Sequence, residues 1–145
     1  MQSLGFFFLM FLGGIAVAVQ PSINARLAQK IGAVESSAVS FAVGTAALLV
    51  VALLAGRGSF RGVAEARGWE LTGGLLGAFF VTLTIIIVPR IGTAAAMAAT
   101  IAAQLMTGIL LDHYGLFGLR TVPCDAKRAV GACLLLAGAA LVFRR

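Results

Sequence analysis

Among the side chains that could do chemistry, the first to stand out are two amides flanking a proline. Gln20 and Asn24 lie four residues apart in an apolar run, which places them on one face if the run is helical. Pro21 removes one helix hydrogen bond, so it frees a carbonyl near residue 17 and permits a kink. An amide beside a kink could contact a polar substrate. Alternatively, both amides cap or bridge helices, as polar side chains in lipid often do.

A third amide, Gln104, lies near the middle of another apolar run. It shares a helical face with Met97, Thr100, Thr107 and Leu111. An unpaired amide is costly in an apolar environment, so Gln104 must face protein or a water-filled cavity. We predict a cavity between the first and fourth apolar runs, lined by Gln20 and Gln104. The predicted substrate contacts are Gln20, Asn24, Thr100 and Gln104.

Asp112 ends the fourth run and is the acid nearest to an apolar segment. A carboxylate inside a membrane suggests proton coupling, whereas one at a helix end is commonly solvated or ion-paired, here with Arg90 or Arg26. We predict that Arg26 and Asp112 act as gating or coupling groups, with Pro21 as a hinge. No acid lies in the middle of an apolar run, so exchange of protons for a cation lacks its central carboxylate. This favours neutral, zwitterionic or anionic cargo.

Enzyme motifs are missing from the sequence. There is no HExxH, no Walker loop and no strand-linked GxGxxG, and no Ser-His-Asp set is recognisable. Cys124 and Cys133 have neither CxxC nor zinc-site spacing. We therefore expect no enzymatic activity, no metal and no cofactor.

Composition explains where these residues must lie. Of 145 residues, 61% are hydrophobic and 11% charged, with a mean hydropathy of +1.06, whereas soluble domains carry about 25% charged residues. A small globule cannot hide so much apolar surface, which excludes a soluble enzyme, a disordered chain and a disulfide-rich module. The net charge of +6 comes from basic residues in ones and twos at the ends of apolar runs. That distribution is typical of headgroup anchors and not of a nucleic-acid-binding patch.

Five apolar runs are each long enough to cross a bilayer, which takes about 20 residues as a helix. They lack the alternation of barrel strands, so we predict an all-α polytopic membrane protein with one domain over residues 1–145. The predicted helices cover 4–28, 34–55, 69–88, 93–111 and 126–143.

The ends of these runs carry further expectations. Pro89 should end the third helix, and the tight turn at 88–92 predicts an antiparallel hairpin of the third and fourth. Arg144 and Arg145 should close the fifth, which is the least polar helix and suits lipid exposure or a dimer seam. The first run lacks the basic start and cleavage site of a signal peptide, so we interpret it as a transmembrane helix.

Basic residues are almost balanced between the two predicted faces of the membrane. One face carries six: Arg57, Arg61, Arg67, Arg120, Lys127 and Arg128. The other carries five: Arg26, Lys30, Arg90, Arg144 and Arg145. A difference of one gives little orienting force, so we predict dual topology and pairing with an inverted copy. The alternatives are that this weak bias suffices, or that a partner sets the orientation.

Four motifs resemble those of the short, YdcZ-type members of the drug/metabolite transporter superfamily. They are QPSINARL at 20–27, SFAVGT at 40–45, GGLLGAF at 73–79, and Gln104 followed by LDHYGLFG at 111–118. The resemblance implies a transporter of small metabolites or drugs in the inner membrane of a bacterium. Longer members contain two inverted five-helix repeats, so a five-helix chain would be half of a ten-helix transporter.

Together, these observations predict a secondary transporter, an exporter, that works by alternating access as an antiparallel homodimer. Its partners would be a small-molecule substrate, membrane lipid and a second copy, with no nucleic acid. The alternatives are a flippase for lipids or lipid-linked sugars, a passive dual-topology channel, and a non-transporting assembly subunit without a polar cavity.

Overall fold

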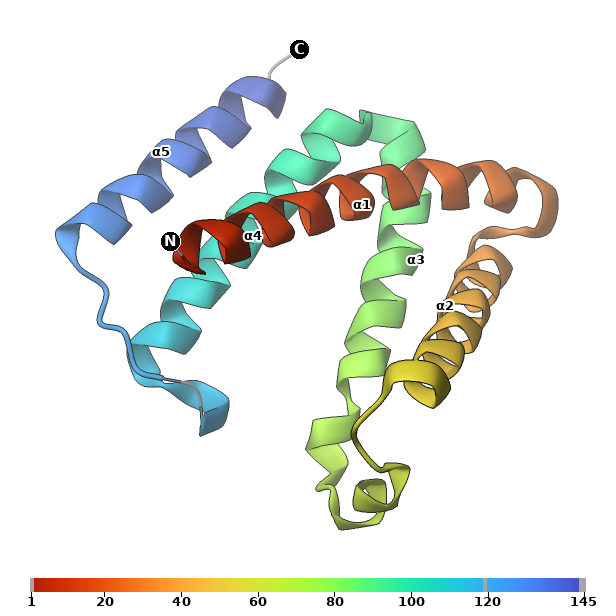
Figure 1. Ribbon diagram of the computed structural model, residues 1–145. Coiled ribbons are helices and arrows are strands. Elements are labelled where there is room, and N and C mark those ends of the chain that lie inside the picture. The colour runs from red at the N-terminus through yellow and green to blue at the C-terminus, as the bar shows by residue number, and fades with distance from the viewer. Residues whose placement is uncertain (1, 119, 144–145) are drawn as a thin grey trace. The chain divides into compact units, whose positions relative to one another are not determined.

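A computed structural model describes residues 2–118 and 120–143, and it confirms the all-α prediction with five apolar helices long enough to cross a membrane (Figure 1). The long helices are α1 (Gln2–Ile31), α2 (Ala33–Ala55), α3 (Gly73–Ile91), α4 (Thr93–Tyr114) and α5 (Ala126–Phe143). Short 3-10 turns are η1 (Phe60–Glu65), η2 (Gly68–Leu71) and η3 (Leu116–Gly118). The predicted closing residues Arg144 and Arg145 lie outside the described residues.

The apolar surface of these helices is left uncovered by the chain itself. In the 18-residue apolar stretch of each membrane-crossing helix, at most 22% of the residues are buried, and in α2 and α5 none of them are. Leu53 and Leu54, for example, are 82% and 83% exposed. Lipid or other protein chains must cover such a surface, because contiguous apolar patches of this size are rare on soluble proteins.

Both prolines lie inside helices, as expected for Pro21 within the predicted helix 4–28 but not for Pro89, which was predicted to end the third helix. α1 continues through Pro21 to Ile31, and α3 continues past Pro89 to Ile91. A proline leaves the carbonyl four residues earlier without its helix partner, so Pro89, which lies in the last turn of α3, removes the bond to a single carbonyl. The third helix also begins later than expected, at Gly73, because residues 68–71 form the 3-10 turn η2.

Single glycines separate α1 from α2 and α3 from α4. Gly32 has φ 98° and Gly92 has φ 86°, a region that residues with a side chain rarely adopt. The chain forms two compact units, residues 1–90 and 91–145, and the second turn lies at their boundary. The antiparallel placement of α3 against α4 therefore stays a prediction.

In the first unit, polar side chains join α1 to α2. The Asn24 amide donates to the Ser40 hydroxyl oxygen at 3.2 Å, and the Ser36 hydroxyl donates to the Asn24 carbonyl oxygen at 2.8 Å. Ser36 is completely buried and Asn24 is 6% exposed. These bonds satisfy polar groups that would otherwise be buried between two helices without a hydrogen-bond partner.

Small residues also bring α2 and α3 together. The Thr82 hydroxyl lies 2.9 Å from the Ser37 hydroxyl oxygen and 2.8 Å from the Ala78 carbonyl oxygen, either of which can take its single proton. A methyl group added at Gly77 would lie 3.1 Å from the Phe41 ring, so the absence of a side chain at Gly77 leaves room for the ring.

We predict that Asn24→Ala and Ser40→Ala are energetically coupled. In a double-mutant cycle, the coupling free energy should be about 0.6 kcal/mol, the average for interhelical hydrogen bonds in a membrane protein. The measurement is the free energy of unfolding in mixed micelles. As a control, Asn24→Ala combined with Thr45→Ala, at an exposed position of α2, should show no coupling. Equal results for the two pairs would contradict the bridge.

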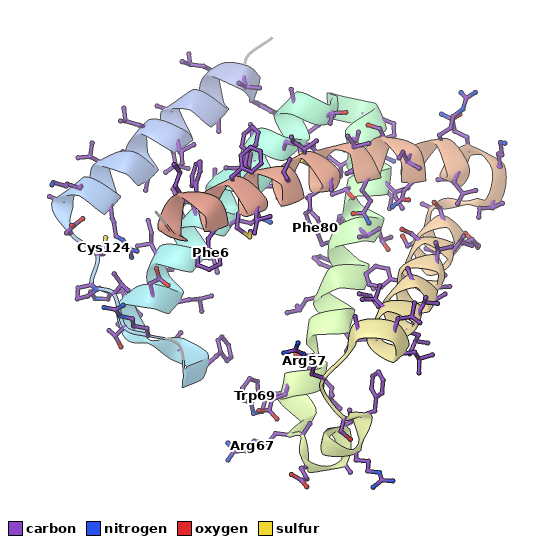
Figure 2. All side chains as sticks on the ribbon, viewed as in Figure 1. Phe6, Arg57, Arg67, Trp69, Phe80 and Cys124 are labelled. Carbon is purple, nitrogen blue, oxygen red and sulfur yellow. The ribbon has the colours of Figure 1, made fainter. Side chains whose placement is uncertain are left out.

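The loop between α2 and α3 gathers basic and amphipathic side chains at one end of the first unit. Figure 2 shows Arg57, Arg67 and Trp69 there, and all three are exposed. The backbone N–H of Arg67 bonds to the Glu70 carboxylate at 2.6 Å, which stabilises η2. Arginine and tryptophan at a helix end are typical of the membrane–water interface.

In the second unit, α4 and α5 lie antiparallel, joined by residues 115–125. α4 ends at Tyr114 and is capped by Gly115, which has φ 58°. The returning segment is held because the Val122 N–H donates to the Asp112 carbonyl at 2.9 Å and the Cys124 N–H donates to His113 Nδ1 at 3.1 Å. α4 is thus three residues longer than predicted.

Asp125 fixes the start of α5, because its carboxylate accepts the Arg128 N–H at 2.8 Å as a helix cap.

Candidate functional site

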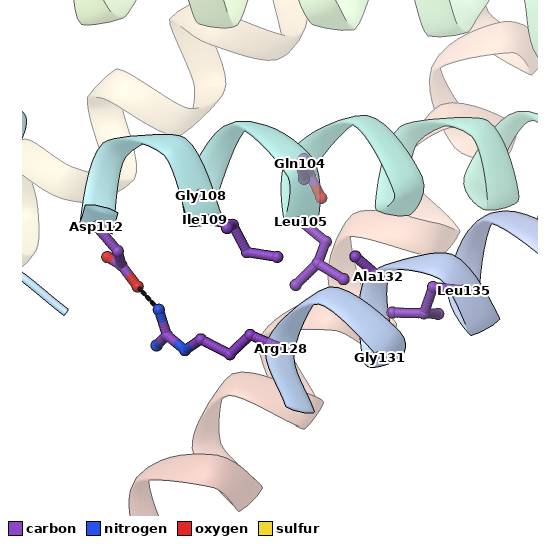
Figure 3. A pocket seen from close by; sticks show the side chains of 9 residues that line it. All are labelled: Gln104, Leu105, Gly108, Ile109, Asp112, Arg128, Gly131, Ala132 and Leu135. Atoms are coloured by element: carbon purple, nitrogen blue, oxygen red, sulfur yellow. Dashed lines mark hydrogen bonds and ion pairs between the residues drawn. The ribbon is translucent and has the colours of Figure 1, made fainter. Parts of the chain in front are cut away.

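The candidate site is a groove between α4 and α5, inside the second unit. A cavity of about 440 Å³ combines charged, amide and apolar side chains (Figure 3). It is lined by Gln104, Leu105, Gly108, Ile109 and Asp112 from α4, and by Arg128, Gly131, Ala132 and Leu135 from α5. An apolar cavity of about 370 Å³ is lined by Ala98, Ile101, Leu134, Leu135, Gly138, Ala139 and Val142. The two share Leu135, and together we call them the α4–α5 groove.

Helical spacing explains why these side chains meet. Gln104, Gly108 and Asp112 lie four residues apart, so they form one row on α4. On α5, Gly131 follows Arg128 by three positions and precedes Leu135 by four, which also gives one row.

Glycine creates the hollow between these rows. A methyl group placed at Gly108 or Gly131 would have no protein atom within 4 Å. The two glycines therefore leave open space where other residues would place a side chain.

One end of the groove is charged. Arg128 Nη1 lies 3.1 Å from Asp112 Oδ2 and 3.4 Å from the Val122 carbonyl oxygen. The side chains of Arg128 and Asp112 are 36% and 39% exposed, so the pair is partly solvated and contributes about 0–1 kcal/mol to stability.

The partner of Asp112 differs from the sequence prediction, which named Arg90 or Arg26. The first turn of α5 lies beside the last turn of α4, and this brings the Arg128 guanidinium within ion-pair distance of the Asp112 carboxylate. An ion-paired Asp112 at a helix end is one of the two readings that the sequence left open; a coupling role stays a prediction.

Gln104 is exposed and lines the groove, and its amide has no hydrogen-bond partner among the described residues. It is the twelfth residue of the 22-residue helix α4, which places it near mid-span. In a membrane, such an amide needs water, a ligand or another polar group.

The other predicted contacts are placed as follows. The Thr100 hydroxyl donates to the Ala96 carbonyl within α4 at 2.9 Å, and Thr100 does not line the groove. Asn24 is occupied by its bridge to α2, the alternative that the sequence left open. Gln20 is exposed. A cavity shared by Gln20 and Gln104 would join the two units, so it stays a prediction.

The remaining hinge and gate candidates lie in the first unit. Pro21 is completely buried and Arg26 is exposed. Their roles as hinge and gate stay predictions.

Sequence reasoning missed the contribution of α5, which was interpreted only as the least polar helix. The available signal was the spacing of Arg128, Gly131 and Leu135, which puts a charge, a gap and an apolar group on one face. That face of α5 indicates a binding groove only when α4 is known to lie opposite it.

The five spans and the uncovered apolar surface define a multi-pass membrane protein, with a groove that is charged at one end. Comparison with known proteins agrees. A family model described as "Putative inner membrane exporter, YdcZ" matches residues 5–141. The chain is 35% identical over 151 residues to the inner membrane protein YdcZ of Escherichia coli (strain K12), covering 99% of this chain and 97% of that protein. No solved structure matches.

The chain belongs to the YdcZ family, as its motifs indicated, and it is a multi-pass protein of the bacterial inner membrane. The description of the family model is that of a membrane exporter, which is a class of transporter.

Proposed function

We propose that this protein is a secondary transporter that exports small metabolites or drugs by alternating access. The observation that carries the proposal is the unpartnered amide of Gln104, near mid-span in the α4–α5 groove. A polar substrate would satisfy this amide in an environment that otherwise penalises it. The family's description as an inner membrane exporter supports the same class.

We also propose that the working unit is an antiparallel homodimer. Five helices with almost balanced basic residues can insert in both orientations, and two inverted copies supply ten helices around an axis in the membrane plane. The uncovered faces of α2 and α5 leave ample apolar surface for a second copy.

Charge placement favours neutral, zwitterionic or anionic cargo. Asp112 lies at the end of α4, paired with Arg128, and no acid lies within the middle of a span. A hydrophobic cation would find no central carboxylate to neutralise it.

The test is counterflow in proteoliposomes loaded with one compound at a time from a panel of amino acids, nucleosides, dicarboxylates and dyes. For a cargo of an alternating-access transporter, we expect an unlabelled internal pool to accelerate uptake of the labelled compound, with saturation. Flux without saturation or counterflow would indicate the channel alternative. Movement of labelled lipid between leaflets, without flux of any soluble compound, would indicate the flippase alternative.

A further inference from the structure

We infer that the α4–α5 groove holds a resident phospholipid, with one acyl chain along the groove and a zwitterionic headgroup carrying a primary ammonium at the Asp112–Arg128 pair. The lipid would occupy the same groove as the cargo proposed to contact Gln104, so the two would bind in turn. Lipid binding is measured without transport, so either proposal can fail while the other stands.

The first argument is the distribution of polarity along the groove. The charges lie at one end, where α4 ends and α5 begins. Beyond Gln104, the walls are aliphatic or glycine, with Ala98, Ile101 and Gly138 among them. A phospholipid has the same order of parts, with a charged head at the interface and a hydrocarbon chain below it.

The second argument is length. From Arg128 to Val142, α5 rises by about 21 Å at 1.5 Å per residue. Half of a hydrocarbon core is about 15 Å thick, so the groove is long enough for the acyl chain of one leaflet. The missing side chains of Gly108, Gly131 and Gly138 leave open space along this path.

The third argument is charge complementarity at the head. Arg128 uses Nη1 for Asp112 Oδ2 and the Val122 carbonyl, and a guanidinium has five N–H donors, so donors remain for a phosphate. Asp112 retains its other oxygen for an ammonium. An anionic headgroup would gain Arg128 but face repulsion from Asp112. A quaternary ammonium could not donate a hydrogen bond to the carboxylate.

Neighbouring charges do not change this preference. Asp125, the residue before α5, and Lys127, in the first turn of α5, are both exposed and opposite in sign. The local charge therefore stays close to neutral, as a zwitterion requires.

A second protein copy fits this groove less well. An inverted copy would place its aliphatic end, around Ala98 and Val142, over the Asp112–Arg128 pair. Removing that pair from water without a polar partner is unfavourable. A lipid places its own charges there.

The test is native mass spectrometry of the delipidated full-length protein, titrated with phosphatidylethanolamine, phosphatidylcholine or phosphatidylglycerol of identical chains. We expect one tightly bound phosphatidylethanolamine. In Asp112→Asn/Arg128→Gln, its affinity should fall about tenfold, to that of phosphatidylcholine, because charge-assisted hydrogen bonds are lost.

Gly131→Phe should fill the groove and weaken all three lipids, with Gly131→Leu as the gentler variant if the first misfolds. Gly13→Phe is the matched control, because a side chain at that α1 glycine also meets no protein atom. Equal affinity for the three headgroups in the wild type, or lipid binding unaffected by both Gly131 variants, would overturn the inference. Cross-linking of a second copy through Gly131→Cys in native membranes would assign the groove to protein instead.

Discussion

Two lysines added to the loop between α2 and α3 should force nearly all molecules into one orientation and abolish transport. Val63 and Ala64 are exposed in η1, so Val63→Lys/Ala64→Lys changes the basic residues from six against five to eight against five. Basic loops are retained in the cytoplasm, so this loop should then lie there in almost every copy. Without inverted partners, the antiparallel homodimer cannot form.

An opposing variant supplies the matched partner. Arg57→Gln/Arg61→Gln/Gln29→Lys gives four basic residues against six, so the reverse orientation should dominate. Each variant alone should be inactive. Their co-expression should restore transport, because together they supply both orientations.

Cys124 provides the measurement. It is exposed in the loop between α4 and α5, where Figure 2 labels it. In a Cys133→Ala background, an impermeant maleimide applied to spheroplasts should label about half of the wild-type molecules, since near-balanced basic residues give little orienting force. Labelling should fall close to zero in the first variant and approach completeness in the second. Wild-type labelling on one side only, or full transport by either variant alone, would contradict the dual-topology homodimer.

Hydropathy predicted the five spans because lipid imposes a simple rule: each span must be apolar and long enough. The helix ends were less predictable. The rule that proline ends a helix failed at Pro89, which lies in the last turn of α3 and leaves only one carbonyl without its helix partner. The end of α4 was missed for another reason. Asp112, His113 and Tyr114 are polar or amphipathic, so the apolar run ends three residues before the helix does at Tyr114.

The site was harder to predict because it depends on which helices are neighbours. The cost of an unpaired amide predicted that Gln104 faces protein or a water-filled cavity, and Gln104 lines the groove. Its role as a substrate contact stays a prediction. The same reasoning could not name Arg128 as the partner of Asp112, since sixteen residues and a turn separate them. Asn24 is the clearest example of what sequence alone could not decide. An asparagine in this apolar run could contact a substrate or bridge two helices. Only the structure, which places Ser40 within hydrogen-bond distance, favours the bridge.

Replacing Gln104 should distinguish a substrate contact from a packing residue. Gln104→Met keeps the length of an unbranched side chain and removes the amide. If the amide binds cargo, the initial counterflow rate should fall about 10- to 100-fold, because the cargo then leaves a polar group unpaired at a cost of about 1–3 kcal/mol. Folding should not suffer, since no protein partner is lost among the described residues and the apolar variant suits a membrane helix.

Gln29→Met is the control, because Gln29 is an exposed amide near the end of α1 and outside the predicted site. Its transport and thermal unfolding in detergent should match the wild type. Gln104→Asn should retain part of the rate, since it keeps the amide one carbon shorter. A Gln104→Met protein that transports normally would remove the amide from the mechanism. A loss of rate accompanied by a lower unfolding temperature would show that Gln104 bonds to another part of the assembly. Only a loss of rate in a fully stable protein, partly rescued by asparagine, makes Gln104 a residue that the cargo touches.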